Sequence, residues 1–345
     1  MKKRAVVSGV TGQDGFLMTE VLLRKGYEVL GISRKQAELP QFKNKDFSLE
    51  TVDFQDYRSL MGLIKEVQPD EVYNFAAQSS SINSWDDTLN TLELNLMAPA
   101  AIMQAIRDYD AKCKLFQALS CEMFGSHPTN VPQNELTGLN PETPYSSAKA
   151  GLLYLIKNYR EKYGLFLIGA IFYNHESYRR NINFLSAKVA QSVANIKLNK
   201  ESCLYVGNMD SKRDFGSAID YMEAAWRVMQ LWNGGEYIFA TGELHSVREM
   251  IELAFKAIHV DIIWKGQGEN EIGVTVKGDV LVRVNPAYYR SYDRCNSIGD
   301  IRKIKEMANW KPSTSFKALI QQMVLHYLSE SKDKSYGCEN NGYSP

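Results

Sequence analysis

Tyr145 and Lys149 are spaced so that one side chain can assist the chemistry of the other. The sequence Tyr-Ser-Ser-Ala-Lys opens a stretch of helical periodicity, and residues four positions apart lie on one face of a helix. A lysine ammonium group beside a phenol favours the phenolate, so Tyr145 can take a proton from a substrate hydroxyl. An exposed Tyr–Lys pair on a helix is the alternative for this pattern taken alone.

A second group of polar residues follows an apolar stretch that ends at Ser120. Ser120 can hydrogen-bond the same oxygen that Tyr145 deprotonates. Glu122 can act as a base toward a C–H bond that a neighbouring ketone has made acidic, and a hydroxyl group one carbon further on can then leave. A glutamate that merely caps the next helix is the alternative for Glu122.

Gly9, Gly12 and Gly15 form a G-x-x-G-x-x-G pattern between the first apolar stretch and the first helical one. Glycines at this place permit a tight turn and let the backbone approach a pyrophosphate at the helix N-terminus. The pattern therefore predicts a dinucleotide site, with a glycine turn that holds no ligand as the alternative.

The end of the second expected strand indicates which dinucleotide is bound. NAD-binding proteins usually carry an acidic residue there, which holds the ribose 2′-hydroxyl. Here Ser33 is followed by Arg34, which can pair with a 2′-phosphate, so NADP is expected. A solvated basic turn is the alternative. Asp53, at the end of the third expected strand, is placed to hydrogen-bond the adenine. Lys149 can also hold the nicotinamide ribose.

The elements that must position these residues alternate between strand and helix. This alternation predicts an α/β fold: a Rossmann-type, doubly wound parallel sheet with a smaller C-terminal α/β domain that binds substrate. We expect the NADP-binding domain at 1–175, with a returning segment near 214–240, and the substrate domain mainly at 176–345. Strands are expected at 4–9, 28–33, 47–53, 71–76, 114–120 and 166–172, and helices at 14–25, 57–67, 89–108, 145–163, 217–230, 246–259 and 315–328.

Bulk properties exclude several classes of protein. Lys+Arg and Asp+Glu both number 40, which argues against nucleic acid or an anionic membrane as the main partner. The five cysteines include no C-x-x-C pair, so neither a disulfide framework nor a metal site is expected, and a reduced cytoplasm fits best. No apolar stretch approaches the ~18–20 residues of a membrane span, and the N-terminus does not read as a signal peptide.

Over nearly its whole length the sequence resembles the extended short-chain dehydrogenases, and specifically the GDP-mannose 4,6-dehydratase family. Segment 201–214 is long and separates that family from relatives that act on UDP- or dTDP-sugars. The stretches that carry the resemblance are Thr11–Asp14, Val67–Asn74, Asn174–Ser177, Arg179–Arg180, 201–214, Tyr289–Arg290 and Gly299–Asp300.

The resemblance implies a role for each matching position. Catalysis falls to Ser120, Glu122, Tyr145 and Lys149. The implied NADP contacts are Gly9, Thr11, Gly12, Gln13, Asp14, Gly15, Ser33, Arg34, Asp53, Phe54, Phe75, Ala76, Ala77, Ser79, Tyr145, Lys149, His175 and Arg180. The implied contacts to sugar, diphosphate and guanosine ribose are Ser84, Glu122, Asn174, Lys188, Arg213, Arg290 and Asp293. Guanidinium groups suit the diphosphate because they bind its oxygens bidentately.

The sequence also departs from the family's pattern. Ser120 replaces threonine, Cys121 replaces serine, Asn90 replaces tyrosine and Asp293 replaces glutamate. The loop after Arg34 is shorter than usual, and in the family that loop helps to join dimers into tetramers. A homodimer is therefore expected, with a homotetramer as the alternative.

The resemblance implies that a tightly held, recycled NADP serves to dehydrate GDP-mannose to the 4-keto-6-deoxy sugar nucleotide. A close relative such as GDP-manno-heptose or an N-acetylated GDP-hexose remains an alternative substrate. Two alternative functions remain: a GDP-sugar 4-reductase or epimerase of the same fold, and a non-catalytic NADP sensor. Glu122 and segment 201–214 argue against the first, and the complete set of Glu122, Tyr145 and Lys149 argues against the second.

Overall fold

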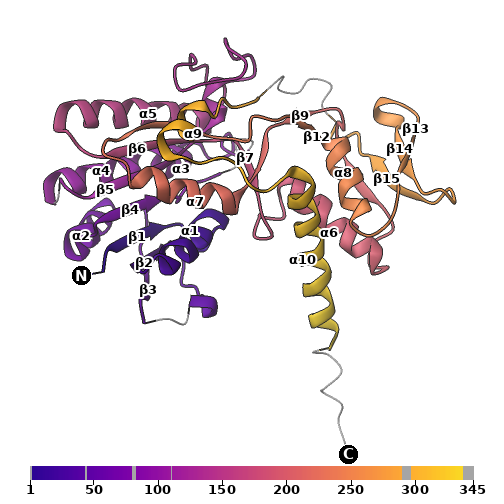
Figure 1. The fold of residues 1–345 in the computed structure, drawn as a ribbon, viewed down its shortest axis with the longest axis horizontal. Helices are drawn as coiled ribbons and strands as arrows, with labels where there is room; N and C mark the ends of the chain where they lie inside the picture. Colours follow the sequence, from indigo (N-terminus) through magenta and orange to yellow (C-terminus); the bar gives the residue numbers. More distant parts are fainter. Residues whose placement is uncertain (1, 43–44, 80–82, 110, 290–296, 337–345) are drawn as a thin grey trace, which may run out of the picture. The chain divides into compact units, whose positions relative to one another are not determined.

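Seven strands pair side by side in one parallel sheet, which carries the N-terminal half of the chain (Figure 1). The structure is a computed structural model, and it describes residues 2–42, 45–79, 83–109, 111–289 and 297–336, without the side chains of 331–336. Within these residues the chain divides into two compact units. Unit 1 comprises Met1–His175, Ala218–Gly242 and Ser297–Pro312, and unit 2 comprises Glu176–Ser217, Glu243–Asn296 and Ser313–Pro345.

The strand order in unit 1 is β3-β2-β1-β4-β5-β6-β11, which is a doubly wound arrangement. The fold class expected from the sequence is thereby confirmed. The strands are β1 (Arg4–Ser8), β2 (Glu28–Ser33), β3 (Phe47–Thr51), β4 (Glu71–Asn74), β5 (Lys114–Ser120), β6 (Leu167–Phe172) and β11 (Gly235–Phe239). In such a sheet the chain order reverses between β1 and β4, and ligands bind beyond the carboxyl ends of the strands at this point.

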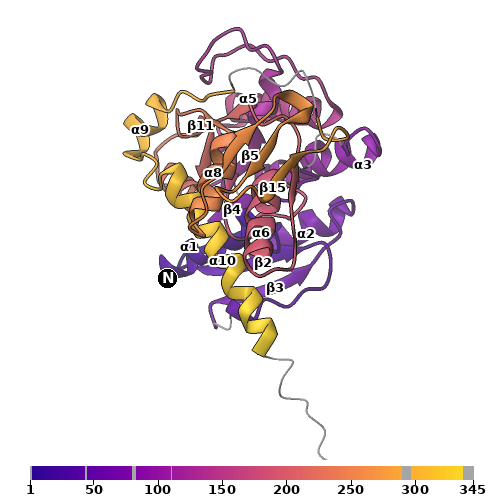
Figure 2. The same cartoon turned by 90° about the vertical axis from the view of Figure 1, so that its right-hand side faces the viewer.

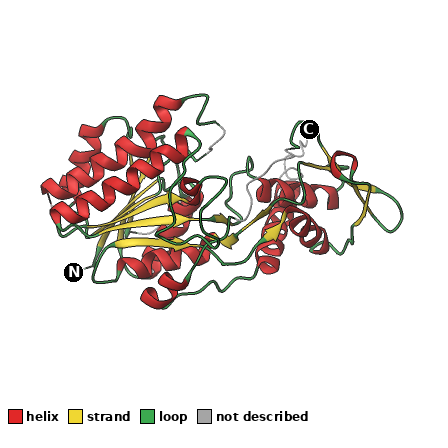
Figure 3. Ribbon diagram, turned by 90° about the horizontal axis from the view of Figure 1, so that it is seen from above, coloured by secondary structure: helices red, strands yellow, loops and turns green. Residues whose placement is uncertain are grey.

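Helices cover both faces of this sheet (Figure 3). Helices α2, α4 and α5 pack on one face, and α1 packs against α7 on the other. Strands that are covered on both sides are apolar throughout, and all six residues of β6 are buried. The helices of unit 1 are α1 (Gln13–Arg24), α2 (Tyr57–Val67), α3 (Thr88–Leu92), α4 (Ala98–Tyr109), α5 (Pro144–Tyr163), α7 (Ala218–Met229) and α9 (Arg302–Ala308).

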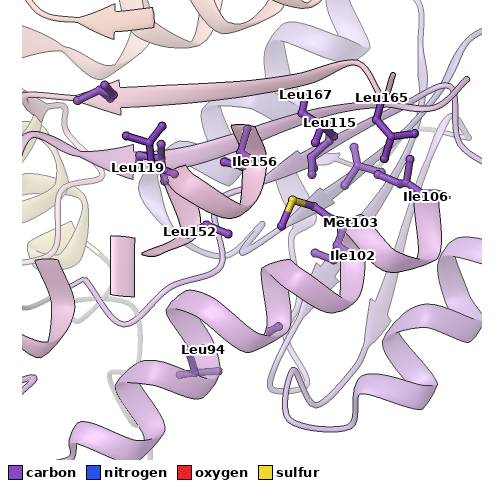
Figure 4. Packing of buried hydrophobic residues seen from close by; sticks show 14 of the residues in the cluster. Leu94, Ile102, Met103, Ile106, Leu115, Leu119, Leu152, Ile156, Leu165 and Leu167 are labelled. Carbon is purple, nitrogen blue, oxygen red and sulfur yellow. The ribbon is translucent and has the colours of Figure 1, made fainter. Parts of the chain in front are cut away.

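The core between the sheet and its α4–α5 face is built from aliphatic side chains (Figure 4). Ile102 and Ile106 of α4 lie near Leu152 and Ile156 of α5, and all four are at most 1% exposed. Leu115 of β5 is completely buried beneath them. This packing fixes α5 against the strand that ends at Ser120.

One helix that the sequence predicts as continuous is interrupted. The periodicity predicts a helix over 89–108, but between α3 and α4 the chain forms a turn of π-helix, Glu93–Met97. Within that turn the buried Asn95 amide donates to the carbonyl oxygen of Thr91 at 3.0 Å and to that of Gln78 at 3.2 Å. The second bond ties the turn to a distant loop, so the interruption depends on tertiary structure that periodicity does not encode.

Unit 2 packs three helices with a four-stranded sheet of order β13-β14-β15-β8 (Figure 2). Its helices are α6 (Leu185–Lys197), α8 (Val247–Lys256) and α10 (Phe316–Tyr336), and its strands are β8 (Leu204–Val206), β13 (Ile263–Lys265), β14 (Ile272–Val274) and β15 (Val280–Val284). Outside the two larger sheets, β7 (Asn174–Glu176) pairs with β10 (Phe215–Ser217), and β9 (Lys212–Arg213) pairs with β12 (His245–Ser246). The sequence pattern places 297–312 in the second domain, whereas α9 packs against α7 and β11 in unit 1.

Candidate active site

The glycine loop lies between β1 and α1, at the point where the strand order reverses. Gly9 has φ +69°, and a Cβ at Gly15 would lie 2.4 Å from the Gly9 carbonyl oxygen, so the turn requires glycine at both places. Helix α1 begins at Gln13 with Gly12 as its N-cap, and no side chain caps it. Uncapped backbone N–H groups at a helix N-terminus suit a diphosphate. The loop therefore fits the dinucleotide that the sequence predicts.

The end of β2 presents a basic side chain. The Ser33 hydroxyl donates to the Lys35 carbonyl oxygen at 2.6 Å and accepts from the Lys35 N–H group at 3.3 Å, which closes a tight turn. Arg34 is exposed at this turn. Asp53 is exposed just after β3, and Phe54 beside it is buried.

The loop after β4 touches the glycine loop directly. A Cβ at Gly9 would lie 2.9 Å from the Ala76 nitrogen, and the Ala76 N–H group donates to the Ser8 hydroxyl at 3.2 Å. The Asn95 amide holds the same loop through Gln78. Asn95 was not among the expected residues, and its only signal in the sequence is an amide within an otherwise amphipathic helix. The expected cofactor residues of this loop are Phe75, Ala76, Ala77 and Ser79.

The turn after β5 carries the two polar residues expected there. The Ser120 hydroxyl accepts the Glu122 N–H group at 3.2 Å and caps a short 3₁₀ helix, Cys121–Phe124. The cap of this helix is thus Ser120, and the Glu122 carboxylate does not have that role. Glu122 is half-buried, whereas Ser120 is buried. The Ser297 hydroxyl donates to Cys121 Sγ at 3.9 Å.

Tyr145 and Lys149 lie in the first turns of α5, which packs against the Ser120 turn. A capping box between Thr143 and Ser146 fixes where the helix begins. Lys149 Nζ lies 5.8 Å from the centre of the Tyr145 ring and donates to the Ala118 carbonyl oxygen at 2.9 Å. Burial lowers the pKa of Lys149 to about 8. A buried ammonium group beside the phenol suits a tyrosine that must release and accept protons.

A chain of buried side chains links these two ends of unit 1. The Ser8 hydroxyl donates to the side-chain oxygen Oδ1 of Asn74, and the Asn74 side-chain NH₂ group donates to Gln117 Oε1 at 2.7 Å. Gln117 in turn donates at 3.1 Å to the Ala118 carbonyl oxygen, which also accepts Lys149. The strand that ends in the glycine loop is thus hydrogen-bonded across β4 and β5 to the lysine. Asn74 and Gln117 were not among the expected site residues, because a buried amide in a strand carries no signal of its partners.

The expected residues beyond α5 divide between the units. His175, at the end of unit 1, contacts Asp14 of α1, and Asn174 precedes it on β7. In unit 2, Lys188 Nζ lies 4.2 Å from the ring centre of Tyr288, and Arg213 donates to the Ser211 hydroxyl at 3.0 Å.

The remaining expected residues are Arg180, Ser84, Arg290 and Asp293. Arg180 pairs with Glu176 at 3.1 Å within unit 2. Ser84 is fully buried in unit 1, and its carbonyl oxygen accepts the Thr88 hydroxyl at 3.2 Å. Arg290 and Asp293 lie outside the described residues.

In the residues that the structure describes, no group of three or more His, Cys, Asp or Glu side chains is placed to hold a metal ion. Within the same residues, none of the helices combines the length and the apolar character that crossing a membrane requires.

Comparison with solved structures shows a shared fold. Relatives in fold include the UDP-glucose 4-epimerase of Thermus thermophilus, solved with NAD, at a TM-score of 0.78 and 24% identity over 94% of this chain and 98% of that one. RMD from Pseudomonas aeruginosa, solved with NADPH, gives a TM-score of 0.77 at 20% identity over 95% and 100% of the two chains. The dTDP-glucose 4,6-dehydratase of Bacillus anthracis, solved with NAD, also gives 0.77 at 20% identity over 96% and 98%.

Comparison of sequences narrows the relationship. The GDP-mannose 4,6-dehydratase of Yersinia enterocolitica is 35% identical over 354 residues, covering 96% of this chain and 95% of its own. The human GDP-mannose 4,6 dehydratase is 38% identical over 335 residues, covering 93% and 90%. The model of the family described as GDP-mannose 4,6 dehydratase matches residues 6–323. On these grounds the chain is a member of the GDP-mannose 4,6-dehydratase family.

Proposed function

We propose that this protein is an NADP-dependent dehydratase that converts GDP-mannose, or a close relative such as a GDP-manno-heptose, to the GDP-4-keto-6-deoxy sugar. The observation that carries this proposal is the placement of Glu122. It stands two residues after Ser120 on a turn that packs against the helix of Tyr145 and Lys149. A carboxylate beside an oxidation site gives the site a second base, which a plain reductase or epimerase does not need.

The chain's own groups move the protons in this scheme. A bound nicotinamide would accept hydride from C4 of the sugar and return it to C6. Tyr145 takes the proton of the C4 hydroxyl, with Ser120 holding that oxygen and Lys149 favouring the phenolate. Glu122 takes the C5 proton and passes it to the C6 hydroxyl, which leaves as water. Glu122 then takes a proton from solvent and delivers it to C5 as hydride arrives at C6, while Tyr145 releases its proton to solvent. The net change is the loss of one water, so the cofactor ends as it began and can stay bound.

Replacement of Glu122 by Gln tests the central step. The variant keeps Ser120, Tyr145 and Lys149, so the sugar should be oxidised at C4 and the absorbance of reduced nicotinamide should appear. Elimination should stall, because the loss of a general base typically slows a step by ~10²–10⁴-fold. In deuterated water the wild type should place deuterium at C5 of the product, whereas the variant should not.

A matched control is Glu236→Gln. Glu236 is a carboxylate of the same unit that pairs with Arg160 near the start of β11, two strands from β5 and level with Gln117, three residues before Ser120. Its removal should leave turnover intact. Rapid product formation by the Glu122 variant would mean that another group is the base. A wild type that oxidises NADPH stoichiometrically would favour the reductase, and one that binds GDP-sugars without turnover would favour the sensor.

The preference for NADP is proposed from Arg34. Its exposed guanidinium at the end of β2 can pair bidentately with a 2′-phosphate. Arg34→Ala should therefore weaken the binding of NADP far more than the binding of NAD in titrations of the cofactor-free protein. Lys35→Ala, which removes the adjacent exposed cation, should change neither affinity strongly. Equal weakening of both cofactors by the Arg34 variant would contradict the assignment.

The sugar, the assembly and the cellular location are proposed on sequence grounds. A panel of GDP-mannose, a GDP-manno-heptose and an N-acetylated GDP-hexose, assayed side by side, identifies the sugar. We propose a homodimer, with a homotetramer as the alternative, and a cytoplasmic location, with which the free thiols of Cys113, Cys121 and Cys203 are compatible.

A further inference from the structure

His175 lies over the start of α1 and is 8% exposed. Its ring packs against Phe172 of β6, with ring centres 4.8 Å apart, and against Tyr221 of α7, at 5.5 Å. The resemblance to the dehydratase family implies only that His175 touches the cofactor. The contacts of its two ring nitrogens indicate a different task.

Both ring nitrogens of His175 face hydrogen-bond acceptors. Nδ1 lies 2.7 Å from the Tyr173 carbonyl oxygen, and Nε2 lies 3.0 Å from Asp14 Oδ2. A neutral imidazole has one N–H group, so either neutral tautomer would point a lone pair at an oxygen atom. Only the doubly protonated ring donates to both partners. The structure therefore indicates an imidazolium at His175.

The partner carboxylate is suited to remain ionised. Asp14 stands in the first turn of α1, where the helix dipole favours negative charge. Its second oxygen accepts the Gln13 amide at 3.0 Å. That amide also donates to the His175 carbonyl oxygen at 3.1 Å. Gln13, Asp14 and His175 thus close a ring of hydrogen bonds between the glycine loop and β7.

We propose that His175 is held as an imidazolium and acts as a positioning residue, clamping the Gln13–Asp14 end of the glycine loop into its cofactor-binding shape. As far as it concerns cofactor binding, this rests on the function proposed above. The clamp acts on the loop and not on the 2′-phosphate. Loss of the clamp should therefore weaken the binding of NADP and NAD equally, whereas loss of the Arg34 side chain should weaken mainly that of NADP.

The protonation state can be measured without any cofactor. At pH 7.5 a histidine in water is mostly neutral, since its unperturbed pKa is about 6.5. In ¹⁵N NMR spectra of the cofactor-free wild type, His175 should nevertheless give two protonated ring nitrogens. Two titratable groups among the described residues face the ring, the Asp14 carboxylate from α1 and the Tyr221 phenol from α7. Asp14→Asn should return the ring to a neutral tautomer.

Assignment of the signal does not depend on a His175 variant that folds. The chain has five histidines, so single replacements of His127, His245, His259 and His326 identify the remaining signal as His175. An unprotonated ring nitrogen at His175 in the wild type at pH 7.5 would overturn the clamp, whatever the protein's activity.

A double-mutant cycle tests whether the clamp holds the glycine loop in its cofactor-binding shape. Asp14→Asn and His175→Gln should each lower the affinity for NADP and for NAD by about tenfold or more in calorimetric titrations. The double variant should bind the nucleotides no more weakly than the single variant with the lower affinity, because the same interaction is lost in all three. Additive losses would show two independent contacts and would contradict the proposal. If the wild type binds neither nucleotide, the proposed function fails, while the NMR result still decides the charge on His175.

Discussion

Lys149 is a charged side chain placed where water cannot reach it. Its Nζ donates to one backbone carbonyl, and burial lowers its pKa to about 8, against an ordinary value of 10.5. Between these two pH values the unfolded chain binds a proton that the folded chain does not. Protons therefore favour the unfolded state there, and the stability of the folded protein rises as the pH rises.

The free energy of unfolding should therefore increase with pH because of this one residue. Between pH 8 and pH 10.5 the wild type should gain on the order of 3 kcal/mol from Lys149 alone, at about 1.4 kcal/mol per pKa unit. Lys149→Met should lack this gain, which urea unfolding of the cofactor-free protein at several pH values would measure. Lys162→Met removes an exposed lysine of the same helix and should keep the wild-type slope. Parallel slopes for the wild type and Lys149→Met would show that the lysine is not desolvated.

At the scale of the element, the N-terminal cap of α5 determines where the catalytic Tyr145 lies. The Thr143 hydroxyl accepts the Ser146 N–H group at 3.1 Å, and Ser146 Oγ accepts the Thr143 N–H group at 2.9 Å. Tyr145 stands between these two residues. The capping box therefore fixes both the helix terminus and the direction in which the phenol leaves the backbone.

Removal of this cap should affect stability and turnover together. Thr143→Ala should lower the free energy of unfolding by ~1 kcal/mol, as cap losses usually do, and should also lower kcat. Thr143→Ser should restore both. Ser315→Ala, which removes the hydroxyl that accepts the Ala318 N–H group at the start of α10, should lower stability without a loss of kcat. An unchanged kcat in Thr143→Ala would mean that the cap does not position Tyr145.

The bounds of the strands and helices show how much of the secondary structure the sequence predicts. Strands 28–33 and 114–120 and helix 57–67 have the predicted bounds, because their periodicity and flanking turns are local signals. The π-turn at Glu93–Met97 and the edge strand β11 depend on contacts with distant segments, which periodicity does not report.

The site shows the same division between local and distant signals. The glycine loop and the Tyr145–Lys149 pair were recognisable because their spacing is short. Asn74, Asn95 and Gln117 were missed because each acts through a partner that is remote in the sequence.

At the scale of the whole molecule, exposed apolar side chains favour assembly. Leu89 is 75% exposed, Met97 48% and Tyr154 56%, and they lie on α3, the π-turn and α5, which pack side by side. Where exposed apolar side chains gather into one patch, that patch marks an interface. We propose that the homodimer forms through this face.

A charged residue introduced into this face should lower the mass of the assembly in solution. Light scattering behind gel filtration should give twice the chain mass for the wild type and a lower mass for Leu89→Glu or Tyr154→Glu. Trp232→Glu, at a residue that is 97% exposed after α7, should leave the mass unchanged. A monomeric wild type would contradict the proposal. A tetramer that both variants reduce to a dimer would instead support the homotetramer.

Unit 1 is assembled from three separate segments of the chain, and this has a consequence for its synthesis on the ribosome. Helix α7, which packs against α1, and strand β11, which pairs with β6, come from Ala218–Gly242, and α9 comes from Ser297–Pro312. A nascent chain that has emerged only as far as residue 175 contains six of the seven strands, but on one face of the sheet it has α1 without α7. At ~5–20 residues per second, the ribosome needs on the order of 10 s to make the remaining segments up to residue 312. For that time an apolar sheet face and an unpaired strand edge stand open, so the nascent chain is a natural client for a chaperone that binds apolar surfaces during synthesis.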